Sequence, residues 1–224
     1  CIYREGIEDK NTTPFLSILV AIASGSIGYA VIFGQFLPDT SSDSLPPAAH
    51  IGPVSWPLVV AALAFGIGML LVYTFSTLFH AAKNPKVKDI LQIGDHISIY
   101  FLIAGTYTPL MVRYLSSKTA TVFLGVMWSI VAIGIIFKIF FTKKFKFISV
   151  LLYLALGWMI VFVIEPLIQT MPFSVFLWIL IGGLSYTIGV YFYVKDHKFY
   201  YHTIWHFFVL FGTIAHFVSV YLSV

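Results

Sequence analysis

The chain contains seven continuous apolar runs, each long enough to cross a bilayer as a helix. About 20 helical residues span the roughly 30 Å hydrocarbon core of a membrane. Runs of this kind exclude a transmembrane β-barrel, whose strands alternate apolar and polar residues. We therefore expect an all-α membrane protein that forms one seven-transmembrane helix bundle. The predicted spans cover residues 14–36, 56–82, 96–114, 119–137, 147–167, 172–194 and 200–224.

The overall composition agrees with this prediction. The sequence is 59% hydrophobic and 10% charged, and its mean hydropathy is +0.94. These values lie outside the range of average soluble domains. No repeat or second domain is visible, so we expect a cytoplasmic N-terminal tail over residues 1–13 and a single membrane domain over residues 14–224. The tail lacks the positive start and short apolar core of a cleaved signal peptide.

The basic residues predict the orientation in the membrane. Of the 13 Lys and Arg residues, only Arg113 and Lys118 fall on one side of the predicted spans, whereas the others, Lys138 included, fall on the opposite side. The positive-inside rule then places the N-terminus in the cytoplasm and the C-terminus outside. Loops that face anionic headgroups account for the net charge of +4. Membrane lipids are thus the expected partners, and no nucleic acid is expected to bind.

Two histidines in the last run, His202 and His206, indicate a functional site. They are four residues apart in the segment HTIWH, so they can face one ion from consecutive turns of a helix. Histidine in lipid costs free energy unless it faces a cavity, a partner or a metal. The spacing is that of the zinc-protease motif HExxH, but Thr203 stands where that motif carries its general base. A catalytic site here would need an acid from elsewhere.

Helix direction brings three more polar residues to the same leaflet. With the predicted topology, the second run ends at the cytoplasmic side with Ser76 and His80, the third begins there with Asp95, and the seventh begins there with the histidine pair. We therefore expect His80, His202 and His206 to bind one metal ion, with Asp95 and Ser76 beside it.

Three neutral imidazoles with an open fourth position form the ligand set of a catalytic zinc site. Bound zinc lowers the pKa of its water to about 7. Asp95 would hold that water or act as general base, and Ser76 would hydrogen-bond the water or a developing oxyanion. Zinc is therefore the predicted cofactor, although imidazole also binds other divalent metals.

Each of these residues also has a purely structural interpretation. The paired histidines can hydrogen-bond carbonyls or Tyr hydroxyls inside a bundle. Asp95 can cap the third helix, and Ser76 can bond the carbonyl four residues before it.

Two further histidines are expected to lie away from the ion. His96 is about 100° around the helix from Asp95, and we expect it at the membrane interface. His216 is about 21 Å beyond His202 along the helix axis, which is too far to share the ion. We expect His216 to form a hydrogen bond inside the bundle.

Several segments together resemble the bacterial hemolysin III family, which is related to the progestin and adipoQ receptors, including adiponectin receptors, and to alkaline ceramidases. The segments are STLFH at 76–80, DHISIY at 95–100, IAGTYTP at 103–109 and HTIWH at 202–206, followed by His216. In such relatives three histidines bind zinc, an Asp reaches it through water, and ceramide hydrolysis is the proposed activity of the receptors. The resemblance implies these roles for Ser76, His80, Asp95, His202 and His206. The first span departs from the family, because residues 11–15 read NTTPF where many members carry a His-Gly pair.

Three functions are compatible with these features. The leading hypothesis is a ceramidase-like, zinc-dependent hydrolase of a lipid amide or ester, with an amphiphilic substrate and a role in membrane lipid homeostasis. The first alternative is a seven-helix receptor or sensor in which structural zinc joins the second and seventh spans. The second is the cytolytic role implied by the family's name, although the charged face of an inserting toxin helix is absent.

Because a histidine ligand must be neutral, zinc and protons compete for the same nitrogens. We expect zinc occupancy of the purified protein to fall as the pH drops below about 6. Metal analysis across a pH series tests this, and constant occupancy down to about pH 4 would argue against histidine ligation.

Overall fold

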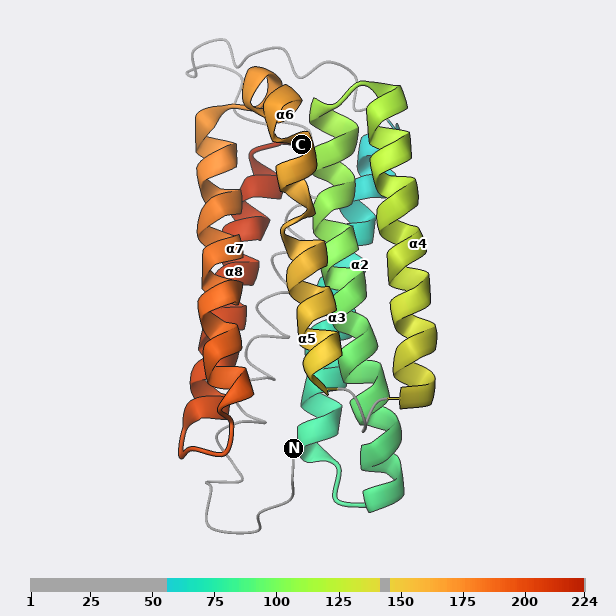
Figure 1. Cartoon of the computed structure of the whole chain (residues 1–224), viewed down its shortest axis with the longest axis vertical. Helices are drawn as coiled ribbons and strands as arrows, with labels where there is room; N and C mark the ends of the chain where they lie inside the picture. Colours follow the sequence, from blue (N-terminus) through green and yellow to red (C-terminus); the bar gives the residue numbers. More distant parts are fainter. Residues whose placement is uncertain (1–55, 142–145, 224) are drawn as a thin grey trace, which may run out of the picture.

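The computed structural model describes residues 56–141 and 146–223, and within these ranges all regular structure is helical. The long helices run along the long axis of an elongated bundle (Figure 1). The helices are α2 (Trp56–Ala81), α3 (Pro85–Tyr114), α4 (Ser117–Phe141), α5 (Lys146–Gly157), the 3-10 helix η1 (Met159–Val163), α6 (Ile164–Thr170), α7 (Phe173–Val194) and α8 (Tyr201–Tyr221). The predicted all-α class is confirmed for this part of the chain. The predicted tail at 1–13 and first span at 14–36 lie outside the described residues.

Five helical segments in the described ranges are long and apolar enough to cross a membrane, which makes this a multi-pass integral membrane protein. They are Trp56–Ala81, Ser117–Phe141, Phe147–Thr170, Phe173–Val194 and Tyr201–Tyr221. Helix α3 is not among these five, and that it crosses the membrane stays a prediction. Its sequence includes charged residues at both ends and Asp95 between them.

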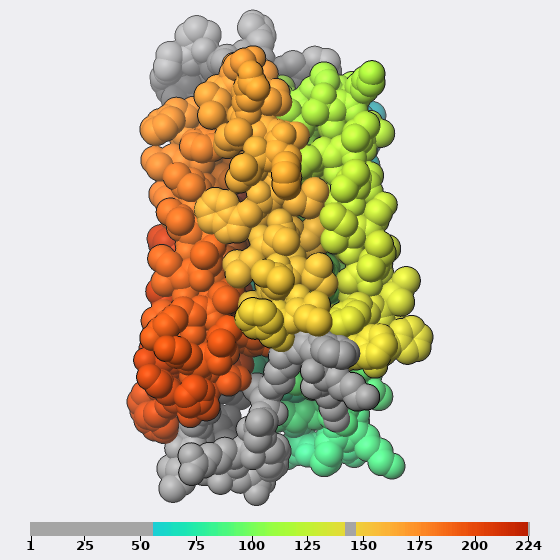
Figure 2. All heavy atoms as spheres, in the orientation of Figure 1, coloured from blue at the N-terminus to red at the C-terminus, as the bar shows by residue number. Residues whose placement is uncertain are grey.

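Large apolar side chains cover the outside of the bundle. Phe140, Phe162 and Phe173 are 73%, 85% and 75% exposed. Helices α4, α5 and α7 form much of the face shown in Figure 2. Apolar exposure on this scale marks a surface that contacts something other than water, as expected of helices surrounded by lipid.

Helices α2 and α3 pack backbone against backbone through two glycines. A Cβ atom at Gly68 would lie 2.8 Å from the carbonyl oxygen of Phe101, and one at Gly105 would lie 2.7 Å from the carbonyl oxygen of Ala64. Small residues permit this close approach, which is a principal source of helix association in membranes. The contact sets the register of the two helices and so brings the end of α2 beside the first half of α3.

Helix α3 begins well before the apolar run that predicted it. Asn84 caps the helix, since its side-chain oxygen accepts a hydrogen bond from the Lys86 N–H at 3.0 Å, and Pro85 occupies the first helical position. Both residue types favour a helix start. The predicted start at residue 96 is therefore too late, and Asp95 lies inside the helix and not at its N-cap.

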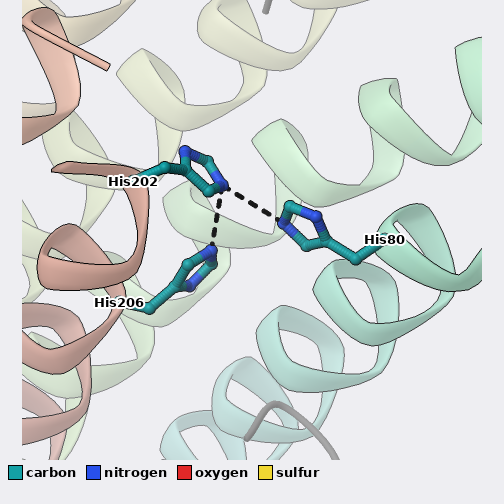
Figure 3. A group of neighbouring side chains, drawn as sticks. All are labelled: His80, His202 and His206. Atoms are coloured by element: carbon teal, nitrogen blue, oxygen red, sulfur yellow. Dashed lines mark hydrogen bonds between the residues drawn. The ribbon is translucent and has the colours of Figure 1, made fainter. Parts of the chain in front are cut away.

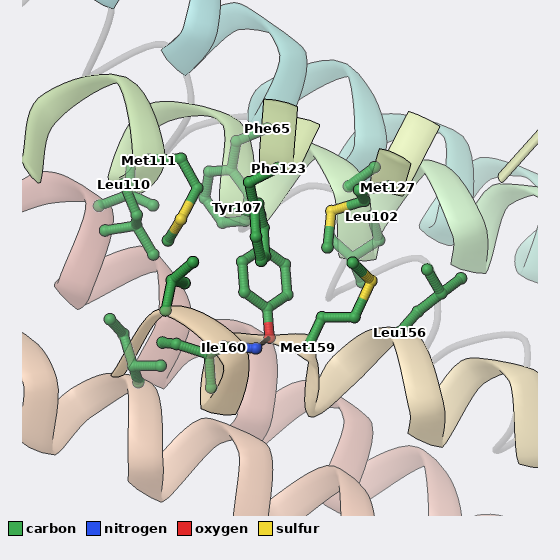
Figure 4. Close-up of a cluster of buried hydrophobic side chains, with 14 of the residues drawn as sticks. Phe65, Leu102, Tyr107, Leu110, Met111, Phe123, Met127, Leu156, Met159 and Ile160 are labelled. Atoms are coloured by element: carbon green, nitrogen blue, oxygen red, sulfur yellow. Dashed lines mark hydrogen bonds between the residues drawn. The ribbon is translucent and has the colours of Figure 1, made fainter. Parts of the chain in front are cut away.

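The predicted fifth span is interrupted in the middle. Helix α5 ends at Gly157, and the chain continues through η1 before α6 begins. Tyr107 of α3 hydrogen-bonds backbone groups at the interruption. Its hydroxyl donates to the Gly157 carbonyl and accepts from the Ile160 N–H at 3.2 Å. Figure 4 shows Tyr107 reaching Ile160 through a cluster of buried apolar side chains. Irregular backbone at membrane depth requires such internal partners.

The glycine contact predicts a difference between two otherwise similar substitutions. Gly105→Ala should lower the thermal unfolding midpoint of the detergent-purified protein, because overpacking against backbone costs about 1–3 kcal/mol. Gly125→Ala in α4 is the matched control, since nothing lies within 4 Å of the added Cβ and the gain in helix propensity is the same. Equal midpoints for the two variants would contradict the close packing of α2 on α3.

Candidate metal centre

Three imidazoles from two helices that are far apart in the sequence meet at one end of the bundle. Nε2 of His202 lies 3.3 Å from Nε2 of His80 and 3.1 Å from Nε2 of His206. One ligand atom from each of the three residues lies within 4.8 Å of the other two. Figure 3 shows the three rings turned toward a common point between α2 and α8. The structure thus brings together the three histidines that the sequence analysis singled out.

Hydrogen bonds alone do not account for this arrangement. The Nε2 atom of a neutral imidazole either donates or accepts, in one direction within the ring plane. His202 Nε2 faces two other nitrogens at once, so one proton placement satisfies one neighbour and not both. A tetrahedral zinc with nitrogens at about 2.0–2.1 Å holds those nitrogens about 3.3 Å apart. The two separations at His202 Nε2 fit a shared metal ion of this size.

The ends of two helices position the three rings. His80 lies in the last turn of α2, whereas His202 and His206 occupy the first two turns of α8. The turn before α8 places Tyr200 in the left-handed region, with φ of 63°. That conformation costs a non-glycine residue about 1–2 kcal/mol. The packing of α7 on α8 therefore holds a strained turn directly beside two of the candidate ligands.

Asp95 and Ser76 lie together in the wall of the cavity that the three histidines also line. The Ser76 side chain hydrogen-bonds the Asp95 carboxylate, and Ser76 is buried in α2. Both residues line the same cavity as His80, His202 and His206. The five residues predicted to form one site thus line one cavity, while their roles in metal binding and catalysis stay predictions.

The cavity that these residues line, called the chamber below, has a volume of about 230 Å³. Its lining includes the three histidines, Asp95 and Ser76 as well as polar side chains away from them, such as Tyr186 and His216, and apolar side chains form most of its wall. The wall includes Ile103, Leu110, Ile164, Phe176, Leu180 and Leu210. An apolar cavity with a few converging polar groups is the usual form of a small-molecule site. The chamber can therefore accommodate an apolar chain whose polar end lies at the histidines.

His96 is placed differently from the prediction. It was expected at the membrane interface, but it is 7% exposed and lines the chamber. Its Nε2 atom lies 3.4 Å from the Tyr193 hydroxyl. A rotation of 100° from Asp95 does not reach lipid, because α3 contacts α2, α4, α5 and α8 around its circumference.

His216 is confirmed as a hydrogen-bonding residue in the bundle interior. Its Nε2 atom lies 3.2 Å from the carbonyl oxygen of Ile179 in α7. Gly182 makes room for the ring, since a Cβ there would lie 2.2 Å from His216 Cδ2. His216 lines the chamber, and ten residues of α8 place it about 15 Å beyond His206 along the axis.

Two residues near the site were not predicted from the sequence. Lys138 was counted among the charges of a cytoplasmic loop, but it lies inside α4 and is 2% exposed. Tyr153 of α5 lines the chamber, and its hydroxyl donates to the His96 carbonyl at 2.9 Å. The apolar residues on both sides of Lys138, in the segment IIFKIFF at 135–141, were a usable signal for its burial. Tyr153 had no comparable signal, because it is a tyrosine within an apolar run.

Comparison with known proteins agrees with the resemblance found in the sequence. The sequence model of the family described as Haemolysin-III related matches residues 14–217. The Hemolysin-3 homolog of Bacillus subtilis (strain 168) is 41% identical over 173 residues, which cover 77% of this chain and 80% of that protein. Hemolysin-3 of Bacillus cereus is 41% identical over 162 residues, or 72% and 74% of the two chains. The human monocyte to macrophage differentiation factor is 26% identical over 168 residues, or 72% and 69%.

The geometry predicts that each of the three histidines is needed for metal binding. His80→Ala, His202→Ala and His206→Ala should each weaken zinc binding by more than the roughly 10–100-fold that follows loss of an outer-shell partner. His197→Ala is the matched control, since it is exposed in the turn before α8 and should leave zinc unchanged. Elemental analysis and zinc titration of the purified variants provide the measurement. Undiminished zinc in any of the three would remove that residue from the ligand set.

Proposed function

This chain belongs to the Haemolysin-III related family, and from that premise we propose that it is a zinc-dependent hydrolase of an amide or ester bond in a membrane lipid. The observation that carries the proposal is a chamber with a largely apolar wall whose lining includes three converging imidazoles and the Asp95 carboxylate. Structural zinc sites usually have four protein ligands, whereas three protein ligands leave one position for a reactant. His80, His202 and His206 would be those three.

The metal and the side chains would have different roles in the reaction. When bound, zinc supplies a Lewis acid that polarises a carbonyl group and acidifies a water molecule. Asp95 takes a proton from the attacking water and returns it to the leaving amine or alkoxide, which is the work of a general base and then a general acid. Ser76 orients Asp95 through the hydrogen bond between the two side chains. The apolar wall keeps bulk water from the reacting carbonyl.

The shape of the chamber supports an amphiphilic substrate. Its apolar wall fits an acyl chain, while the histidines and Asp95 would face the amide or ester that joins this chain to a head group. Burying each methylene contributes about 0.8 kcal/mol, so the acyl chain would supply most of the binding energy. The bond that is cleaved would lie at the histidines. A ceramide-like lipid has both parts, and a role in membrane lipid homeostasis follows from turnover of such lipids.

The proposed topology is seven transmembrane helices with the N-terminus in the cytoplasm and the C-terminus outside. This topology includes the predicted span at residues 14–36, which lies outside the described residues, and takes α3 to cross the membrane although it carries charges. The support for this orientation is the lysine-rich character of the α2–α3 and α7–α8 connections. These connections lie at the same end of the bundle as the start of α5 (Figure 1). The zinc site then belongs to the cytoplasmic leaflet of the bacterial plasma membrane.

A receptor or sensor with structural zinc is the second candidate. It is favoured by the position of the histidines, because an ion held by His80 and His202 would join α2 to α8 across 122 residues of sequence. A cytolytic role, which the printed names of the Bacillus relatives suggest, has no separate support in the described helices.

Substitution of Asp95 separates the hydrolase from the receptor. Asp95→Asn should lower the release of fatty acid from a lipid panel by roughly 100-fold or more, the usual contribution of a general base, while zinc stays bound. Asp89→Asn is the control, because Asp89 is exposed on the same helix. Free fatty acid would be quantified by mass spectrometry with protein in detergent micelles. Equal release by wild type and Asp95→Asn would refute the mechanism.

A further inference from the structure

Lys138 is a buried cation in an apolar helix. It lies in the last turn of α4, within the membrane-spanning segment Ser117–Phe141, and is 2% exposed. A lysine near the end of a span normally extends its ammonium to the headgroups, and such a residue would be exposed. An ammonium removed from water costs several kcal/mol unless charge and hydrogen bonds compensate it. Buried charges inside membrane proteins commonly mark function.

The surroundings of Lys138 connect it to the metal centre. Its Nζ atom lies 6.0 Å from the ring centroid of Tyr153, at the limit of a cation–π contact. The Tyr153 hydroxyl bonds the carbonyl of His96, the residue that follows Asp95. The ammonium of Lys138 also acts electrostatically on the Asp95 carboxylate. Lys138 therefore approaches from α4 the acid that Ser76 contacts from α2.

Close packing of α4 on α3 permits this approach. Gly134 lies one turn before Lys138, and a Cβ there would lie 2.6 Å from Cζ of Tyr100. Tyr100 is fully buried in α3, and its ring centroid lies 4.6 Å from that of Tyr153. The glycine thus lets α4 lie against these rings, where the lysine stem extends into the bundle and not outward to lipid.

We propose that Lys138 is a positioning residue, whose buried ammonium stabilises the negative charge of Asp95 and holds that carboxylate beside the metal centre. The pairing is inferred from the burial of Lys138, its position over the Tyr153 ring and its electrostatic effect on Asp95, whereas its effect on turnover rests on the hydrolase function proposed above. The proposed action of Lys138 is through Asp95 and not through a ligand of the metal.

A double-mutant cycle tests the pairing without any assumption about activity. Lys138→Met and Asp95→Asn should each lower the thermal midpoint by about 4 °C or more, because each leaves the other charge without its partner. The double variant should lose clearly less than the sum of the two shifts. Lys118→Met is the matched control, since Lys118 is exposed near the other end of α4, and it should leave the midpoint unchanged. Additive shifts would overturn the proposal.

The test of the pairing also works if a single variant folds poorly. If Lys138→Met yields no folded protein, the double variant with Asp95→Asn should recover it, and failure of that recovery contradicts the pairing. Lys138→Arg, which keeps the charge, should retain most of the wild-type midpoint.

The positioning role has its own measurement. Lys138→Met should leave zinc content unchanged, lower kcat for lipid hydrolysis at least about 10-fold with little change in KM, and have no further effect in the Asp95→Asn background. An equal loss in both backgrounds would mean that Lys138 acts independently of Asp95. If wild type releases no fatty acid, the hydrolase proposal fails while the thermal cycle still decides the pairing.

Discussion

The meeting of three imidazoles between α2 and α8 is the contact on which the rest of the site depends. The helices form two tightly packed pairs, α2 with α3 and α7 with α8, and direct packing between the pairs is sparse. His80 belongs to the first pair, whereas His202 and His206 belong to the second. A cation bound at the three nitrogens would therefore join the two pairs at one end and close the chamber that lies between them.

Glycines and buried polar groups make this meeting possible. Gly68 and Gly105 set the register of α2 on α3, which places Ser76 against Asp95. The strained turn at Tyr200 sets the start of α8. The result is a cavity with a largely apolar wall whose lining includes the three histidines, Ser76 and Asp95. A lining of this kind suits a molecule that has a polar head and an apolar chain.

Much of this arrangement could be predicted from the sequence. Apolar runs located the five described membrane-spanning segments to within a few residues at most ends, and helix direction brought Ser76, His80 and Asp95 to the same end as the HTIWH segment. The break at Gly157 was not predictable, because Tyr107, which satisfies it, lies 50 residues away. Lys138 was misassigned because charge counting treats every lysine near a span end as solvated. Only tertiary packing shows that its side chain is enclosed.

X-ray absorption at the zinc edge, recorded on the zinc-loaded protein in detergent, tests the central claim most directly. The account predicts an inner shell dominated by nitrogen at about 2.0–2.1 Å, with outer-shell scattering that fits three imidazole rings. Only one imidazole ring, or none, in the fitted spectrum would contradict it.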